Sequence, residues 1–317
     1  MAYQALSREA LEASIGRLNK GLGMLSNVLE PGKVRMLDWN LLREDLSLPA
    51  AVLYQDRLTH NLRWMQDFIT AYRVLLAPHG KTTMAPRLFE MQLQSGAWGI
   101  TLATAQQTLV AYAHGVRRVL MANELVGKEN MAIVSRMLDD PEFEFYCLVD
   151  SAAQVEQLGA YFSERAQRLH VLLELGVMGG RAGIRNSDQL NSMLEALARW
   201  KDTVSLDGVE LYEGVLNEEA AIRDFLQRAV SIARMLSAAK HFRREPFLLS
   251  GAGSAWYDVV AEVFTAAGFG DSTEIVLRPG CYLTHDVGSY RKAQERILEN
   301  NPIAHRMNSG LVPALHV

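Results

Sequence analysis

Cysteine is scarce in this sequence: two residues in 317, Cys147 and Cys281. Two cysteines cannot build a disulfide scaffold, and neither belongs to a Cys-x-x-Cys pair, so we expect reduced thiols and a cytoplasmic protein. The N-terminus lacks the basic-then-apolar pattern of a signal peptide, and no apolar run approaches the length that spans a membrane. These absences predict a protein that does not bind membranes.

An excess of one charge is also missing, because 32 Lys and Arg stand against 36 Asp and Glu. We therefore expect no nucleic acid among its partners. The metal-binding patterns His-x-His, His-Glu-x-x-His and Cys-x-x-Cys do not occur, so the sequence predicts no metal site. What is present is a 49% hydrophobic and 21% charged composition, which is typical of a soluble protein with a large core.

The dominant pattern is a repeated unit of a short apolar strand, a turn and an amphipathic helix. The strand candidates are residues 75–78, 99–104, 118–123, 143–150, 170–175, 208–212, 246–250 and 274–277. The helical patterns between them are residues 85–95, 105–113, 128–138, 152–166, 188–200, 218–239 and 255–267. Strands that alternate with helices indicate parallel β-α units, and strands rich in Val, Ile and Leu indicate burial on both faces. Eight units predict an α/β fold, a (β/α)8 TIM-type barrel, with an open doubly wound sheet as the alternative.

Both flanks of the chain depart from this pattern. Residues 1–46 are predicted to form a polar N-terminal helical extension, followed by a strand at 50–54 and a helix at 56–72. The barrel is predicted to occupy residues 47–280. After Gly280 we expect irregular structure, and residues 281–317 are interpreted as the start of a second, β-rich domain that looks incomplete at the C-terminus. The reason is that residues 311–317 resemble a strand, and an apolar terminal strand needs a partner.

Barrel enzymes carry their reactive groups at the C-terminal ends of the strands. Lys81 follows the first barrel strand, where partial desolvation would lower its pKa and supply the neutral amine of a Schiff-base nucleophile. A solvated loop lysine is the commoner alternative. His79 could orient a ligand or simply be a hydrogen-bonded loop residue.

The loop after the seventh strand, Ser250-Gly251-Ala252-Gly253-Ser254, is small and precedes a helix. Its backbone N–H groups could surround an anion, and barrels often bind phosphate at this place; a plain strand-to-helix turn is the alternative. The loop is not a dinucleotide fingerprint, because Trp256 stands where the third Gly belongs. Gly80-Lys81-Thr82 is not a P-loop either, because Leu75 replaces the required Gly.

Other strand ends carry polar or aromatic residues. Arg181 lies in a Gly-rich loop after the fifth strand and could bind a phenolate or carboxylate, or remain solvated. Tyr212 could face a cofactor ring or pack in the core. Glu124, Glu174 and Glu213 would suit a glycosidase if two of them were correctly spaced, although local salt bridges would explain them equally well.

Six short motifs occur in an order typical of a known family. They are Pro-His-Gly-Lys-Thr-Thr at 78–83, Leu-Ala-Thr at 102–104, Gly-Gly-Arg-Ala-Gly-Ile at 179–184, Leu-Tyr-Glu-Gly at 211–214, Ser-Gly-Ala-Gly-Ser at 250–254 and Arg-Pro-Gly-Cys-Tyr at 278–282. Together they resemble the D-threonine aldolase / D-serine dehydratase-like family of alanine racemase-like, fold-type III pyridoxal-phosphate enzymes, including its bacterial amino acid deaminases. The resemblance spans about residues 48–286.

This resemblance implies a barrel, a pyridoxal 5'-phosphate cofactor, a small D-amino acid substrate and a homodimer. It implies that Lys81 is the catalytic residue and forms the Schiff base, that Arg181 contacts the ring hydroxyl, and that Tyr212 lies near the pyridine ring, whose nitrogen could instead contact Arg278. The cofactor-binding residues implied by the family are Lys81, His79, Thr104, Arg181, Tyr212, Ser250, Gly251, Gly253, Ser254 and Tyr282.

The chain also differs from the family. Members often carry a His or Lys soon after the Schiff-base lysine, where this chain has Thr83 and Met84. The family further implies a divalent metal, zinc or manganese, held by a His-x-Cys pair that is not found in this chain. We expect a D-serine or D-threonine deaminase (an ammonia-lyase) or a D-threonine-type aldolase. A non-catalytic protein of pyridoxal-phosphate homeostasis, an amino-acid racemase and, third, a glycosidase-like barrel are the alternatives.

Overall fold

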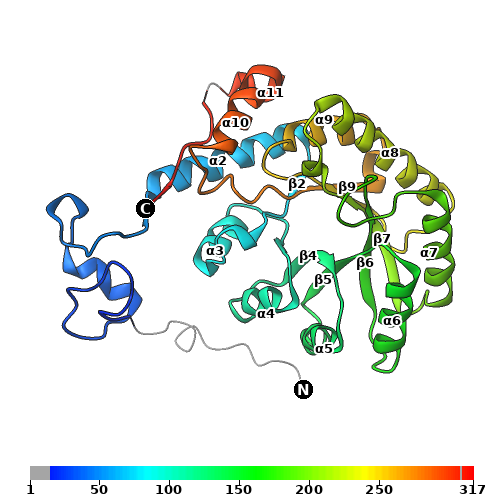
Figure 1. Cartoon of the computed structure of the whole chain (residues 1–317), viewed down its shortest axis with the longest axis horizontal. Helices are drawn as coiled ribbons and strands as arrows, with labels where there is room; N and C mark the ends of the chain where they lie inside the picture. The colour runs from blue at the N-terminus through cyan, green and yellow to red at the C-terminus, as the bar shows by residue number, and fades with distance from the viewer. Residues whose placement is uncertain (1–14, 308) are drawn as a thin grey trace.

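The computed structural model describes residues 15–307 and 309–317. Eight parallel strands form one sheet at the centre, and helices cover its outer face (Figure 1). The strands are β2 (Leu75–Leu76), β3 (Ile100–Leu102), β4 (Arg118–Glu124), β5 (Glu144–Val149), β6 (Leu169–Leu175), β7 (Val204–Leu211), β8 (Phe247–Gly251) and β9 (Thr273–Leu277). All eight predicted strands are confirmed. Strand β7 begins four residues before its predicted start, because Ser205 and Asp207 interrupt its apolar pattern.

The helices that alternate with the strands also follow the prediction. They are α3 (Pro86–Gln94), α4 (Ala105–Ala113), α5 (Lys128–Met137), α6 (Ala152–Ser163), α7 (Ser187–Arg199), α8 (Glu219–Ala238) and α9 (Tyr257–Ala266). Local capping explains two of the starts: the Thr104 hydroxyl accepts from the Gln107 amide at 3.1 Å, and the Asn186 side chain accepts from the Gln189 amide at 2.9 Å.

The sheet closes into a barrel. Its strand order is β2-β9-β8-β7-β6-β5-β4-β3, so chain order runs around the sheet without reversal. The segments at the two ends are joined because the amide of Trp98 donates to Leu76 at 2.7 Å and the amide of Thr101 donates to Pro78 at 2.9 Å. This closure favours the barrel over the doubly wound sheet.

The barrel interior is apolar along most of the strands and becomes polar toward their C-terminal ends. One cluster of inward side chains fills the lower part: Ala77, Leu120, Tyr146, Leu148, Leu172, Leu248 and Val276. Toward the C-terminal strand ends, the buried inner residues change to Glu174, Glu210 and Arg278. Buried charged groups need specific partners, so this upper layer is where ligand chemistry is expected.

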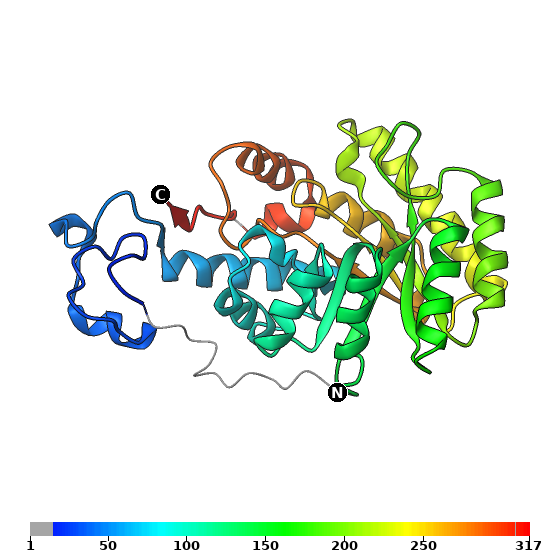
Figure 2. The same cartoon turned by 60° about the horizontal axis from the view of Figure 1, so that its bottom comes forward.

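The N-terminal flank differs from its prediction. Residues 15–46 contain only two short 3₁₀ helices, Pro31–Leu37 and Leu41–Arg43, so the expected helical extension is wrong for this part, and residues 1–14 lie outside the described residues. Turn-forming Gly, Pro, Asn and Asp residues explain the irregular path. The segment, drawn in blue, lies beside the barrel rather than on it (Figures 1 and 2). It leads into β1 (Val52–Leu53) and α2 (Gln55–Tyr72).

The C-terminal flank, in contrast, contains more regular structure than expected. Residues after Gly280 include α10 (Ser289–Asn300) and α11 (Pro302–Arg306), which were not predicted, and α11 contacts α2. The terminal strand β10 (Leu315–His316) pairs antiparallel with β1, which gives a second, two-stranded sheet. The buried Asn61 amide holds this segment by donating to Leu283 and Val312, each at 2.8 Å. The domain boundaries at residues 46 and 280 remain predictions.

Among the described residues, no helix is both long and apolar enough to cross a membrane.

Candidate active site

A cavity of about 220 Å³ lies at the C-terminal ends of the barrel strands. The loops after β2, β6, β7, β8 and β9 contribute to it, together with α10. Its lining residues are His79, Lys81, Thr82, Ala122, Leu148, Glu174, Arg181, Glu210, Tyr212, Ala252, Gly253, Ser254, Arg278, Gly280, Cys281 and Tyr290. This is the end of the barrel at which the sequence predicts the site.

Lys81 belongs to a short 3₁₀ helix, Gly80–Thr82, directly after β2. Partial burial lowers the pKa of its amine, and the positive charges of Arg181 and Arg278 lower that pKa further. Lys81 makes no hydrogen bond or ion pair with another described residue. A lysine amine without an anionic partner loses its proton more easily. The neutral amine is the form that attacks a carbonyl.

His79 lies beside Lys81 with most of its ring covered. Burial, followed by the charges of Arg278 and Lys81, lowers the pKa of His79 to about 3, so its ring is neutral near pH 7. Its Nδ1 is buried and has no hydrogen-bond partner among the described residues. A buried ring nitrogen without a partner is a point at which a ligand or water can bind.

Arg278 is the innermost cation of the cavity. Its guanidinium donates to Glu210, to the Ser250 hydroxyl at 3.1 Å and to the Leu211 carbonyl at 3.0 Å. Only 4% of Arg278 and 1% of Glu210 are exposed, so both charges are removed from water and depend on each other.

The Gly-rich loop after β6 presents Arg181. Its base is closed because the Gly176 amide donates to Ile184 at 3.1 Å and the Ile184 amide donates to Glu174 at 2.8 Å. Arg228 of α8 donates to the Gly176 carbonyl at 2.7 Å and to the Ile184 carbonyl at 2.6 Å. This clamp fixes where the loop leaves the barrel.

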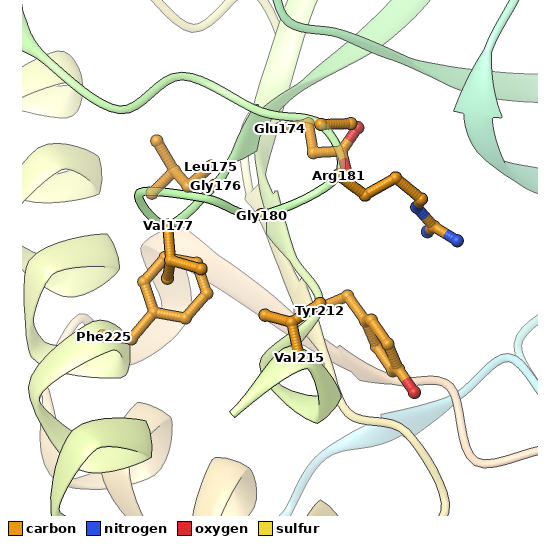
Figure 3. Close-up of a pocket in the computed structure, with 10 residues that line it drawn as sticks. Glu174, Leu175, Gly176, Val177, Gly180, Arg181, Tyr212, Val215 and Phe225 are labelled. Atoms are coloured by element: carbon orange, nitrogen blue, oxygen red, sulfur yellow. The ribbon is translucent and has the colours of Figure 1, made fainter. Parts of the chain in front are cut away.

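Inside the same loop, Arg185 donates to the Val177 and Gly180 carbonyls, each at 3.0 Å. Gly183 has a φ of +91°, and its amide donates to Asp150 at 3.1 Å. Figure 3 shows Val177 beside the Phe225 ring, whereas Arg181 and Tyr212 extend together to the other side. The guanidinium of Arg181 makes no hydrogen bond or ion pair with a described residue, so it is available to a ligand.

The loops after β8 and β9 gather backbone N–H groups around oxygen atoms. The amides of Gly280 and Cys281 both donate to the Ser254 hydroxyl, at 3.1 and 3.0 Å. The amides of Ala252 and Gly253 donate to the two carboxylate oxygens of Glu213, at 3.0 and 2.7 Å. These four amides therefore have partners within the protein, and the bonds fix the two loops that border the cavity at Gly253, Ser254 and Gly280.

The structure separates the predicted site residues into two groups. The residues that line the cavity are His79, Lys81, Arg181, Tyr212, Gly253 and Ser254. The residues that do not line it are Thr104, Ser250, Gly251 and Tyr282. Thr104 caps α4, and Ser250 supports Arg278. The Tyr282 hydroxyl accepts from Gln92 at 3.2 Å in a fully buried position, where burial raises its pKa. Their roles toward a cofactor remain predictions.

The carboxylates do not form the arrangement of a glycosidase. Glu213 is completely buried and its two oxygens accept from backbone amides, so it holds a loop and does not line the cavity. Glu174 lines the cavity and lies within hydrogen-bonding reach of Glu124. A glycosidase needs two carboxyl groups on opposite sides of a sugar, and these contacts do not provide them.

Two polar residues of the cavity lining were not recognised in the sequence. Glu210 is the inward residue of β7 next to its end, and the alternation of a strand that is buried on both faces does not distinguish it. Tyr290 comes from α10, in the region that was expected to be irregular. The sequence that follows Ser289 has the residue pattern of a helix, and this pattern could have revealed Tyr290.

The described residues contain no group of three or more His, Cys, Asp or Glu side chains placed to hold a metal ion. The divalent metal expected from the family resemblance therefore has no site among them, and no step below depends on it.

Comparison with known proteins agrees with this geometry. The family model described as "Alanine racemase, N-terminal domain" matches residues 53–273. A D-threo-3-hydroxyaspartate dehydratase of Delftia sp. (strain HT23) is 29% identical over 143 residues, which are 45% of this chain and 37% of that protein. A 3-hydroxy-D-aspartate aldolase of Paracoccus denitrificans (strain Pd 1222) is 21% identical over 218 residues, 67% of this chain and 56% of that protein. The chain thus spans between a third and three fifths of these relatives' lengths.

Solved structures share the fold. The D-threonine aldolase from Filomicrobium marinum superposes with a TM-score of 0.68 at 22% identity, covering 86% of this chain and 69% of that one. The D-threo-3-hydroxyaspartate dehydratase from Delftia sp. HT23 superposes with a TM-score of 0.59 at 25% identity, covering 76% of this chain and 62% of that one.

Proposed function

The chain belongs to the alanine racemase N-terminal domain family, and from this premise we propose that it is a pyridoxal-phosphate-dependent lyase acting on D-amino acids that carry a β-hydroxyl group. The reaction is that of a D-serine or D-threonine deaminase or of a D-threonine-type aldolase, as the dehydratase and aldolase activities named for its relatives support. The observation that carries the proposal is the unpaired Lys81 amine, which shares the cavity with Arg181 and Arg278.

The residues present fit this cofactor. Lys81 offers an amine for covalent attachment, and Arg181 offers a free guanidinium for an anionic ring oxygen. The buried, partnerless Nδ1 of His79 marks a polar position that a ligand would satisfy. The loop at Gly253 and Ser254 borders the cavity at the place where barrels often bind a phosphate. We propose that these five residues and Tyr212 hold the cofactor.

When bound, pyridoxal phosphate supplies an electron sink that stabilises negative charge at the substrate α-carbon. Lys81 Nζ, neutral more often than an exposed lysine, is the base that takes the α-proton. Arg181 orients the ring oxygen by donating hydrogen bonds from its guanidinium. His79 is uncharged, so it adds no further positive charge beside Lys81.

The experiment is a titration of the purified protein with pyridoxal 5'-phosphate, followed by absorbance, borohydride reduction and peptide mapping. We expect a visible band, lost on reduction, with the label on the peptide that contains Lys81. Lys81→Ala should abolish the reducible band, and Lys201→Ala, which removes an exposed lysine outside the cavity, should retain it. A label on another lysine, or a band that persists in Lys81→Ala, would refute the assignment.

Turnover then separates the candidate reactions. Pyruvate and ammonia from D-serine indicate a deaminase, glycine and acetaldehyde from D-threonine indicate an aldolase, and conversion of one enantiomer to the other indicates a racemase. Cofactor attachment without any turnover indicates the non-catalytic, homeostatic alternative.

Two finer proposals accompany this function. We propose a homodimer, on the family resemblance, to be checked by light scattering. We also propose a cytoplasmic location, supported by Cys147 and Cys281, which are both unpaired as a reducing compartment keeps them.

A further inference from the structure

Three glutamates lie close together at the inner end of the cavity, on three strands of the barrel. Glu124 ends β4, Glu174 is in β6 and Glu210 is in β7. Glu174 and Glu210 line the cavity, with 7% and 1% of their surfaces exposed. The reaction proposed above uses none of the three.

The positive charge near these carboxylates does not balance them. Arg278 donates to Glu210, and its other hydrogen bonds go to neutral groups, the Ser250 hydroxyl and the Leu211 carbonyl. The second oxygen of Glu210, Oε2, and the Oε1 of Glu124 are buried without a hydrogen-bond partner among the described residues. Burying an ionised carboxylate without a partner is costly, so the cluster is stabilised by binding a proton.

The contact between Glu174 and Glu124 shows where a proton can be held. The two side chains lie within hydrogen-bonding reach of each other, and two carboxyl groups can form such a bond only if one of them carries a hydrogen. Burial, then the charge of Glu210, then the hydrogen bond with Glu124 raise the pKa of Glu174 to about 10. Asp150, at the end of β5, adds a further negative charge in the same direction.

The positions of the two partners also differ. Glu174 lines the cavity and Glu124 does not. Glu124 is only half-buried, so water can solvate it when its partner turns away. We infer that Glu174 and Glu124 hold one proton between them at neutral pH, and that Glu174 turns this proton toward an acceptor atom of the ligand in the cavity. Glu174 is thus a neutral hydrogen-bond donor in the cavity.

The first test does not require a ligand, so it is independent of the proposed function. An infrared difference spectrum of ligand-free wild type minus Glu174→Gln at neutral pH should show the carbonyl stretch of a protonated carboxylic acid, shifted in heavy water. Glu295→Gln, an exposed substitution on α10, should give no such band. Absence of the band from the wild type minus Glu174→Gln spectrum would overturn the inference.

A second variant keeps the test decisive if Glu174→Gln does not fold. Glu124→Gln removes the partner carboxylate and one negative charge. We expect the pH at which the protonated band disappears to fall by about one unit or more. An unchanged midpoint would mean that Glu124 does not share the proton.

The donor role is tested by the affinity for pyridoxal 5'-phosphate, measured by absorbance, and this part rests on the proposed function. Glu174→Gln keeps a donor of similar shape and should bind within about threefold of the wild type. Glu174→Leu removes the donor and should bind about tenfold more weakly, the equivalent of one hydrogen bond. Equal affinity in all three proteins would refute the donor role. Failure of the wild type to bind would refute the proposed function, and the infrared result would stand.

Discussion

Glu213 illustrates how a single carboxylate can fix a loop from inside. It is wholly buried, yet it needs no cation, because its Oε1 accepts from the Gly253 amide at 2.7 Å and its Oε2 from the Ala252 amide at 3.0 Å. A carboxylate satisfies two converging N–H groups at once, and no neutral side chain of the same length can.

We therefore predict that Glu213→Gln destabilises the protein by about 1–3 kcal/mol, because its amide nitrogen would face a backbone N–H and leave it unsatisfied. Urea unfolding monitored by circular dichroism measures the loss. The neighbouring Glu218→Gln is the control: Glu218 is exposed and makes no side-chain cap bond, so its unfolding free energy should change by less than about 0.5 kcal/mol. Equal stability of Glu213→Gln and wild type would show that the two amides have other partners.

At the same scale, some site residues were predictable from the sequence and others were not. Lys81 and Arg181 stand in distinctive local strings at strand ends, so position and motif identified both. Glu210 has no such string, because one inward residue in a strand buried on both faces looks like any other. Its importance comes from Arg278, which is 68 residues away in the chain and meets it past β8, the strand that lies between β7 and β9.

The loop after β6 is the element on which the cavity depends most directly. Arg228 comes from α8, outside the loop, and its hydrogen bonds to Gly176 and Ile184 hold the two ends of the loop together. It does not line the cavity, so its influence on a ligand passes through the position of Arg181.

Arg228→Ala should weaken pyridoxal 5'-phosphate binding by about tenfold or more, because the loop carrying Arg181 loses two charge-assisted hydrogen bonds. Arg228→Lys keeps the charge and one bond, and should recover part of the affinity. Absorbance titration measures both variants, and urea unfolding reports general stability. If affinity falls only in proportion to stability, or if Lys gives no recovery, Arg228 has no positioning role.

Helices and strands were predicted correctly where the apolar periodicity of the sequence alone determined them. Helices α3 to α9 and all barrel strands follow apolar periodicity, which depends on burial against one sheet. The flanks failed for opposite reasons. Residues 15–46 contain turn-forming Gly, Pro, Asn and Asp residues that interrupt a helix. Helix α10, in contrast, forms where it packs against α9, as the hydrogen bond from the Tyr257 hydroxyl to Gln294 at 2.8 Å shows.

At the scale of the whole molecule, buried ionisable groups make stability depend on pH in two opposite directions. Glu174 has a raised pKa, so the folded state retains a proton that the unfolded state releases above about pH 4.5; this contribution is lost as pH rises toward 10. His79 has a pKa lowered to about 3, so the unfolded state takes up a proton first, and stability falls as pH drops below 6.5. Lys81, with its lowered pKa, opposes Glu174 on the alkaline side.

The shape of the stability curve therefore tests the cavity without any ligand. We predict that the unfolding free energy of the wild type declines relative to Glu174→Gln between pH 7 and pH 9, by up to about 1.4 kcal/mol per pH unit for one proton. Urea unfolding across pH 5–9 measures both proteins. The same relative decline should continue down to about pH 5, because the unfolded Glu174 carboxyl already releases its proton above about pH 4.5 while the folded one retains it. His79 is present in both proteins and does not contribute to the difference between the two curves. Parallel curves over pH 5–9 would mean that Glu174 is ionised in the folded state as it is in the unfolded state, and that Arg278 alone neutralises the negative charge at this end of the cavity.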